Sequence, residues 1–195
     1  MIRCWEPRDA PLLKAAVDSS LDHLRPWMPW AYDEPQPLPE KIELLRGFRG
    51  RFDLGDDYVY GIFSKRETEV LGGSGLHTRV GPEGFEIGYW VSAAAAGNGV
   101  ATETTAVLTR AGIELAGADR IEIRVDPSNE ASMKVPRKLG YTEEATLRRR
   151  LPGRRPNDEL RDSVIFSLLR EELDASPAAA VEYDAYDAAS RLVVG

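Results

Sequence analysis

The first third of the chain has apolar residues at helical spacing. Between residues 9 and 25 they recur every three or four positions and stop at Pro26, which predicts a helix. A second helix is predicted over 39–52, where the apolar positions again share one face. The connection "RPWMPWAYDEPQPLP" is typical of an ordered loop. Its tryptophans, Trp27 and Trp30, are expected to pack on the core or to form one wall of a ligand pocket.

The pattern changes after residue 57. The segments 58–64, 69–78 and 84–92 are β-branched and aromatic runs separated by turn residues, which indicates an antiparallel meander. The pattern then predicts a helix over 99–117, a strand over 120–125, a short helix that ends at Gly140, and two final strands that flank an arginine-rich loop. This order predicts one mixed α/β domain with a single sheet over 1–175. The acidic, alanine-rich tail, 176–195, has the composition of a disordered segment unless something holds it.

The composition narrows the class of protein. The 195 residues are 43% hydrophobic and 29% charged, which is ordinary for a globular chain that folds without a disulfide or a metal. Cys4 is the only cysteine, and the two histidines are far apart, so neither a zinc site nor thiol chemistry is expected. No apolar run approaches the ~20 residues of a membrane span, and the N-terminus lacks the apolar segment of a signal peptide. We therefore expect a cytoplasmic protein without a metal.

Charge is unevenly distributed along the chain. The formal net charge of -7 makes nucleic acid an unlikely main partner. Five arginines nevertheless crowd into "RRRLPGRRP" (148–156). This cluster is either a solvated hairpin loop or an electrostatic guide for an anionic ligand or an acidic protein substrate.

The stretch Gly97-Asn98-Gly99 lies at a predicted strand-to-helix junction. Glycine permits positive φ and lets a ligand approach the backbone closely. The first amides of the following helix have no internal partner, and the helix dipole adds partial positive charge, so the junction suits an anion such as pyrophosphate. It is not a dinucleotide-binding motif, since Thr102 replaces the final glycine, and no Gly-Lys-Ser/Thr follows to make a P-loop.

Several stretches, taken in order, resemble the GNAT acetyltransferases, in particular their RimJ/RimL-like branch. They are "SLDHLRPWMPWA" (20–31), "FEIGYWVS…GNGVATET" (85–105), "RIEIRVDPSNEASMKVPRKLGY" (120–141) and "RDSVIFSLLREEL" (161–173). The resemblance implies a GNAT-like fold: a single V-splayed, mostly antiparallel sheet of about seven strands, flanked by helices. It also implies acetyl-CoA held between two strands, with direct transfer of the acetyl group to a primary amine and no metal.

The resemblance also implies a set of site residues. Backbone groups of Trp90, Val91 and Ser92 would pair with the pantetheine arm, and Asn129 would bond to it. The pyrophosphate would meet amides in the turn and first helical residues: Gly97, Asn98, Gly99, Val100, Ala101 and Thr102. Ser132 would lie near the thioester sulfur, and Trp27, Trp30 and Tyr89 are expected on the acceptor side.

Two residues are the candidates for acid–base catalysis. Glu86 is expected to act as the base through a water molecule, or else to bind substrate or pair with an arginine. Ser132 is expected to act as the acid, or else only to cap or face the helix. Tyr89 and Tyr141 are further candidate donors, and Asp162 is a further carboxylate.

The chain departs from the family pattern at three positions. Ala94 and Ala96 stand where basic or bulky residues usually support the pyrophosphate, and nearby candidates to replace that charge are Lys134, Arg137 and Lys138. Pro136 stands where many members have a tyrosine acid, and it cannot bond to the carbonyl of Ser132. The alternative to an enzyme is therefore a catalytically degenerate acyl-CoA-binding or interaction protein.

The partners that follow are acetyl-CoA and an amine acceptor. The acceptor is either a peptide N-terminus or a small molecule, and no membrane is expected to take part. If the tail is held in place, it packs on its own chain or on a partner subunit, so a homodimer is expected.

Overall fold

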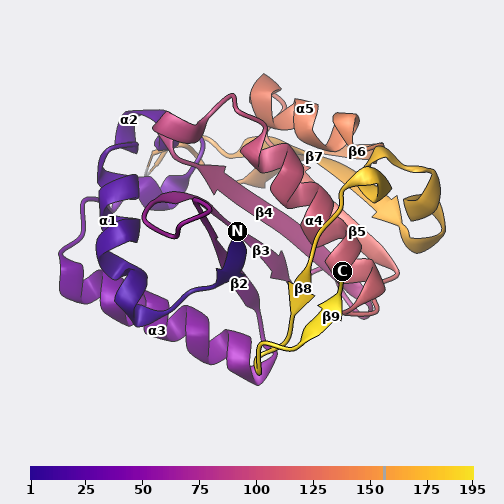
Figure 1. Cartoon of the computed structure of the whole chain (residues 1–195). Helices are drawn as coiled ribbons and strands as arrows, with labels where there is room; N and C mark the ends of the chain where they lie inside the picture. The colour runs from indigo at the N-terminus through magenta and orange to yellow at the C-terminus, as the bar shows by residue number, and fades with distance from the viewer. Residues whose placement is uncertain (156) are drawn as a thin grey trace.

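Seven strands form one sheet in the order β1-β2-β3-β4-β5-β7-β6 (Figure 1). The computed structural model describes residues 1–155 and 157–195. The strands are β1 (Ile2–Cys4), β2 (Tyr58–Phe63), β3 (Val70–His77), β4 (Gly84–Val91), β5 (Arg120–Val125), β6 (Thr142–Leu151) and β7 (Arg161–Leu169). Every neighbouring pair is antiparallel except β4 and β5. The structure thus confirms a mixed fold with a mostly antiparallel sheet, and it adds β1, whose three residues are too few to show an alternating pattern.

Five α-helices flank this sheet. They are α1 (Ala10–Asp18), α2 (Leu21–Leu24), α3 (Leu38–Leu54), α4 (Val100–Glu114) and α5 (Glu130–Lys138). The one helix predicted over 9–25 is in fact two. The break has a local cause, because the Ser19 hydroxyl bonds to the carbonyls of Ala15 and Ala16, while the Ser20 hydroxyl accepts a bond from the Ala93 N–H.

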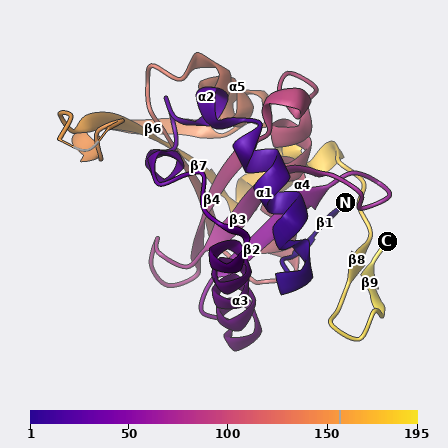
Figure 2. The same ribbon diagram turned by 90° about the vertical axis from the view of Figure 1, so that its left-hand side faces the viewer.

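The helices bury two separate apolar clusters. One lies under α4 and α5 and includes Ile121, Phe166 and Leu168. The other lies under α1 and α3 and includes Trp5, Leu45 and Phe63. Figure 2 shows α1, α2 and α3 together on one side of the molecule, with β6 and β7 extending away from them. The two faces of the sheet are therefore covered by different parts of the chain.

The one parallel pair in the sheet is short. β4 and β5 pair only from Gly84 opposite Arg120 to Glu86 opposite Glu122. Beyond Glu86, β4 continues to Val91 and β5 to Val125 with no pairing between them. The two strands therefore separate, and the unpaired edge of β4 faces an opening. This is the V-shaped splay expected from the family resemblance.

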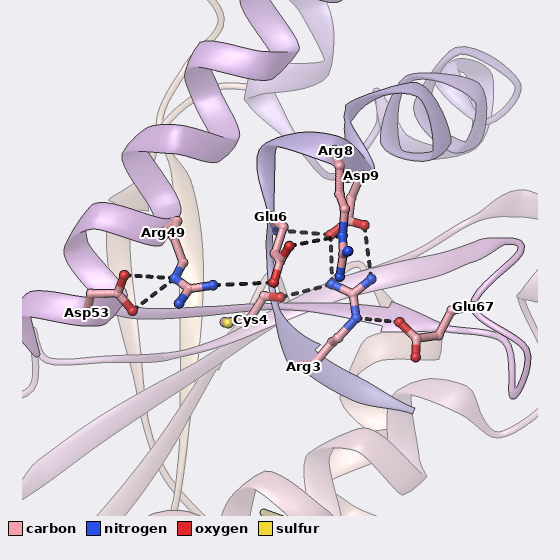
Figure 3. A network of polar contacts seen from close by, with 8 residues as sticks. All are labelled: Arg3, Cys4, Glu6, Arg8, Asp9, Arg49, Asp53 and Glu67. Carbon is pink, nitrogen blue, oxygen red and sulfur yellow. Dashed lines mark hydrogen bonds and ion pairs between the residues drawn. The ribbon is translucent and has the colours of Figure 1, made fainter. Parts of the chain in front are cut away.

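An ion-pair network fixes the short strand β1 (Figure 3). Arg3 binds Asp9 through two bonds of 2.7 and 2.9 Å, and its Nε lies 2.5 Å from Glu67. The backbone N–H of Glu6 also donates to Asp9. Arg49 of α3 bonds to Asp53 in the same region. These contacts tie β1 to the start of α1 and to the turn between β2 and β3.

The tail packs on its own chain. Its 3₁₀ turn, Pro177–Ala180, places Ala178 fully inside the cluster under α4. Arg110 of α4 donates to the carbonyl of Val181, and the hydroxyl of Tyr183 donates to Glu114. A small hairpin of β8 (Ala185–Tyr186) and β9 (Leu192–Val194) ends the chain. The tail therefore has a defined conformation, although its separation from the domain at residue 175 stays a prediction.

None of the helices in residues 1–155 and 157–195 combines the length and the apolar character that crossing a membrane requires.

Candidate active site

A cleft of about 320 Å³ lies where β4 and β5 separate. Its walls come from α2 and the loop after it, the end of β4, the first turn of α4, and α5. The predicted site residues that line it are Trp27, Tyr89, Trp90, Val91, Gly97, Gly99, Val100, Ala101, Thr102, Asn129 and Ser132. Residues from four separate stretches of sequence are thus brought to one opening.

Four predicted residues lie outside this lining. Trp30 packs edge-on against Trp90, with ring centroids 5.9 Å apart, so it supports the wall from behind. Asn98 donates to the carbonyls of Ala95 and Ala96 and braces the turn. The other two are Ser92, whose backbone bonds within the protein, and Glu86, which forms ion pairs.

The backbone groups of Ser92, expected to pair with the pantetheine, form hydrogen bonds within the protein. The Ser92 N–H donates to Leu71 on β3 at 2.8 Å, and its carbonyl accepts from Ala95 at 3.0 Å. Both groups are therefore used within the protein. Because backbone groups alternate in direction along a strand, the neighbouring Val91 turns its N–H and carbonyl toward the open side.

The glycine turn has the conformation that its sequence predicts. Gly97 and Gly99 have φ values of +79° and +82°, and a Cβ on either would meet no atom within 4 Å. Gly99 is followed at once by α4, so the N–H groups of Val100, Ala101 and Thr102 begin the helix beside the cleft. Free amides, the positive end of the helix dipole and the absence of side chains together make an anion site.

Two lysines add positive charge to this site. Lys134 and Lys138, one helical turn apart on α5, both line the cleft beside Ala96. Arg137 is turned away and bonds to Glu143 at 2.8 Å. Of the three basic residues considered as replacements for the missing charge at Ala94 and Ala96, only the two lysines therefore line the cleft among the described residues.

Ser132 and Tyr89 meet inside the cleft. The hydroxyl of Tyr89 lies 3.0 Å from Ser132 Oγ and 3.2 Å from the Ser132 carbonyl oxygen. Asn129 caps α5 by accepting the Ser132 N–H at 3.1 Å. Burial raises the pKa of Tyr89 to about 12, although the bond to Ser132 opposes that rise. Tyr89 therefore keeps its proton near neutral pH, and a pair of hydroxyl groups faces the cleft.

The other candidate donors are remote from this pair. Tyr141 is buried in the apolar cluster and bonds to Thr109 at 2.5 Å. Asp162 accepts the backbone N–H of Arg149 in the β6–β7 hairpin. Neither lines the cleft.

Glu86 lies at the point where β4 and β5 part. It is buried, Arg79 donates to its Oε1 at 2.5 Å, and Arg124 Nε lies 3.3 Å from its Oε2. Within the described residues, Oε2 accepts no hydrogen bond. Glu86 therefore forms ion pairs at the apex of the splay, and its buried Oε2, beside Arg124, keeps unused hydrogen-bonding capacity.

Sequence reasoning missed some lining residues. His23, Leu24 and Met28 reach the cleft from α2 and the loop after it. His23 and Leu24 fall in the segment predicted as a helix and Met28 in the loop after it, but the pattern did not show which of them faces a cleft, so only the nearby tryptophans pointed there.

One arginine of the cluster at 148–156 lies against the wall of the cleft. Arg154 stacks on Trp27 at 5.0 Å and donates to Ser128, while Arg161 pairs with Asp126 at 2.6 Å. One arginine of the loop thus contacts the cleft wall directly.

No three His, Cys, Asp or Glu side chains come together as a metal site would require in the part of the chain that the structure describes.

Comparison with known proteins identifies the family. Residues 1–142 match the family described as the acetyltransferase (GNAT) domain. YdaF of Bacillus subtilis (strain 168), named as a ribosomal N-acetyltransferase, is 26% identical over 173 residues, which cover 88% of this chain and 91% of YdaF.

Solved structures agree with that match. Mycobacterium smegmatis RimJ, in complex with CoA-disulfide, is 25% identical with a TM-score of 0.78, covering 91% of this chain and 85% of RimJ. A RimL acetyltransferase in complex with coenzyme A shares the fold, with 19% identity, a TM-score of 0.76, and coverage of 86% and 92%. The family match spans well over half of the sequence, and the splayed sheet and glycine turn agree with it. The chain therefore belongs to the GNAT acetyltransferases, enzymes whose acetyl donor is acetyl-CoA.

Proposed function

We propose that this acetyltransferase transfers the acetyl group to the N-terminal α-amine of a protein, with a ribosomal protein as the acceptor. The observation that carries the transfer is the cleft at the β4–β5 splay, which is lined both by the glycine turn at the start of α4 and by the Tyr89–Ser132 pair of hydroxyl groups. The names of YdaF and of the RimL protein, an α-N-protein acetyltransferase, support the choice of acceptor. An acceptor on the ribosome would place the enzyme in the cytoplasm.

The lining residues suit the chemical parts of acetyl-CoA. The pyrophosphate would bind at Gly97, Gly99 and the first amides of α4, with Lys134 and Lys138 supplying charge. The pantetheine would run along the open edge of β4, where the backbone of Val91 is exposed to it. We include Asn129 and Trp90 in this set because both line the same path, although the alternation that opens the backbone of Val91 turns the backbone of Trp90 toward β3.

The hydroxyl pair is the proposed proton donor. A departing thiolate is stabilised by a donor, and Ser132 Oγ lines the cleft while Tyr89 orients it at 3.0 Å. The single hydroxyl proton of Tyr89 is shared between the Ser132 carbonyl oxygen and Ser132 Oγ in a three-centre bond, which leaves the serine proton free to point into the cleft. This arrangement supports Ser132 as the donor and gives Tyr89 a positioning role.

Glu86 is the base expected from the sequence. Its Oε2, which is buried and accepts no hydrogen bond within the described residues, supports activation of a water at the apex of the splay. That water would have to compete with Arg79 and Arg124 for the same carboxylate.

Calorimetric titration with acetyl-CoA tests the proposed site. We expect binding in the micromolar range, and a loss of at least tenfold, about 1.4 kcal/mol, in Gly99→Trp, because the indole would fill the anion site. Gly117→Trp is the matched control, since Gly117 has a similar φ of +76° and open space around it but lies beyond the far end of α4. Equal binding by both variants would place the donor elsewhere.

A second candidate is an acyl-CoA-binding protein without catalysis. Ala94, Ala96 and Pro136 favour it because each replaces a residue that would assist binding or proton transfer. It predicts acetyl-CoA binding with no transfer to any peptide bearing a free N-terminus. Steady transfer to such a peptide excludes it.

A homodimer is part of the proposal. The β8–β9 hairpin exposes Tyr186, Leu192 and Val193, with exposed fractions of 62%, 58% and 54%. Sedimentation at several concentrations tests this, and a monomer mass at every concentration would contradict it.

A further inference from the structure

A histidine and a carboxylate pair beside the splay, outside the residues considered above. His77 is the last residue of β3, and Asp57 precedes β2. His77 Nδ1 lies 2.8 Å from Asp57 Oδ1. Because an ionised carboxylate can only accept, Nδ1 carries the proton, which leaves Nε2 of the neutral ring with a free lone pair. The carboxylate thereby fixes both the tautomer and the orientation of the ring.

The ring lies over two glycines that face each other. Gly75 on β3 is the direct partner of Gly88 on β4. A Cβ on Gly75 would come within 2.8 Å of His77 Nε2, and one on Gly88 within 3.4 Å. The absence of a side chain at Gly75 leaves room for the imidazole, whose Nε2 reaches across from β3 to within van der Waals contact of the Gly88 position on β4.

The His77 ring lies at the apex of the splay between β4 and β5. His77 is the register partner of Glu86, and Glu86 opposite Glu122 is the last pair between β4 and β5. Gly88 is already beyond that last pair, one residue before Tyr89, which lines the cleft. Nε2 thus lies beside the first residues of β4 that no longer pair with β5.

His77 and Tyr89 occupy opposite faces of the sheet. Side chains alternate along a strand, so His77 and Gly75 share a face, and Leu76 points to the other. Leu76 belongs to the cluster under α4, against which Tyr89 also packs. A group held by His77 would therefore approach the splay from the face opposite to the Tyr89–Ser132 pair.

The charged groups around His77 are Asp57, Glu86 and Arg79, with Arg124 paired to Glu86. Glu86 and its arginines form ion pairs with one another, whereas His77 has one nitrogen without such a contact. Histidine is also the side chain whose charge ordinarily changes near neutral pH, which suits a base for an amine.

We propose that His77, oriented by Asp57, is the general base that deprotonates the acceptor amine. His77 Nε2 takes one proton from the ammonium group, and the neutral nitrogen adds to the thioester carbonyl carbon. The carbon–sulfur bond breaks, and sulfur keeps the electron pair and receives the second nitrogen-bound proton by way of Ser132. The imidazolium then releases its proton to solvent. The products are the N-acetyl amide, the free thiol and one proton. This inference rests on the proposed function.

The tautomer can be tested without turnover. Long-range ¹H–¹⁵N spectra of the imidazoles should show neutral His77 with its proton on Nδ1 and with Nε2 unprotonated, and His23 provides the comparison signal. Asp57→Asn should increase the proportion of the Nε2–H form. A wild-type His77 with its proton on Nε2 would overturn the proposal, because that nitrogen could not accept another.

Kinetics test the role in transfer. The probe is a pool of hexapeptides with free N-termini, with the same pool blocked at the N-terminus as the blank. We expect His77→Gln to lower kcat/KM by about 10²-fold or more and to remove the acidic limb of its pH profile. Asp57→Asn should lower it by about tenfold, and the adjacent exposed Asp56→Asn should leave it unchanged. The affinity for acetyl-CoA should stay constant in all three.

Three results would overturn the assignment. One is kcat/KM within twofold of wild type in His77→Gln. Another is loss of the acidic limb in Glu86→Gln while His77→Gln retains it, which would assign the base to Glu86. The third is the absence of transfer by the wild-type protein, which would overturn the proposed acceptor together with the role of His77. In the first two results the wild-type protein still transfers the acetyl group, so a failure of the role of His77 can be told apart from a failure of the proposed function.

Discussion

The hydroxyl of Tyr89 lies 3.2 Å from the backbone carbonyl of Ser132 and replaces a hydrogen bond that the helix lacks. In a regular α5 that carbonyl would accept the N–H of residue 136, but Pro136 has none. A side chain from β4 therefore compensates for a proline in α5. The same hydroxyl lies 3.0 Å from Ser132 Oγ, so the proline and the proposed proton donor are linked through one tyrosine.

This link predicts coupling between Tyr89 and Pro136. Tyr89→Phe should lower the free energy of unfolding by about 1–2 kcal/mol, because it leaves a half-buried carbonyl without a protein partner. In a Pro136→Ala background the helix can supply its own N–H, so the same substitution should cost about 1 kcal/mol less. Urea unfolding of the four proteins in this cycle measures the difference. Additive effects would show that Tyr89 does not compensate for the proline.

Ser132→Ala is expected to act on the chemical step. If the serine supplies a proton to the thiolate, kcat should fall by about 10²-fold while the affinity for acetyl-CoA stays unchanged. Ser19→Ala, at the exposed end of α1, is the control. A fall in affinity with constant kcat would instead make Ser132 a binding residue.

The raised pKa of Tyr89 gives this step a pH dependence. Burial raises its pKa to about 12, so the hydroxyl keeps its proton through pH 10, where an ordinary tyrosine ionises (about 10). We expect kcat to show no decline from tyrosine ionisation up to about pH 10. A limb below this pH that disappears in Tyr89→Phe would contradict the assignment.

The two lysines of α5 should strengthen binding of the donor by charge. Each of Lys134→Ala and Lys138→Ala is expected to raise the Kd of acetyl-CoA about threefold, and the double variant about tenfold, or 1.4 kcal/mol. Since both lysines lie at an open cleft, the loss should shrink as salt rises. Arg137→Ala is the matched control, because that arginine sits on the same helix but pairs with Glu143. Equal effects of all three would indicate general surface charge rather than a site.

A feature of the fold or of the candidate site could be predicted from the sequence where it depends on residues that are neighbours along the chain. The meander, α4 and the glycine turn were predictable because alternation, helical spacing and positive φ are encoded within a few neighbouring residues. The V-shaped splay followed only from the family resemblance, because the register of β4 against β5 is a relation between distant segments. The Tyr89–Ser132 contact escaped prediction for the same reason, since the two residues are distant in sequence. An arginine partner for Glu86 was one expected alternative, but the sequence did not indicate which arginines it would be.

Asp9 should make the stability of the fold sensitive to acid. Burial alone would raise the pKa of Asp9, but the bonds from Arg3 and from the Glu6 N–H outweigh it and lower the pKa below its usual value. A carboxyl group whose pKa is lowered by folding stabilises the protein above its unfolded-state pKa of about 3.9, and loses that contribution as the pH falls through the folded-state value. Asp9→Asn should therefore lower the free energy of unfolding by about 1–3 kcal/mol at pH 7 and by much less below pH 3. Asp53→Asn is the control from the same network, since its exposed pair with Arg49 should contribute under about 1 kcal/mol (Figure 3). Urea unfolding at both pH values decides the matter, because a cost of Asp9→Asn that does not change with pH would mean that the ion pair with Arg3 is not its source.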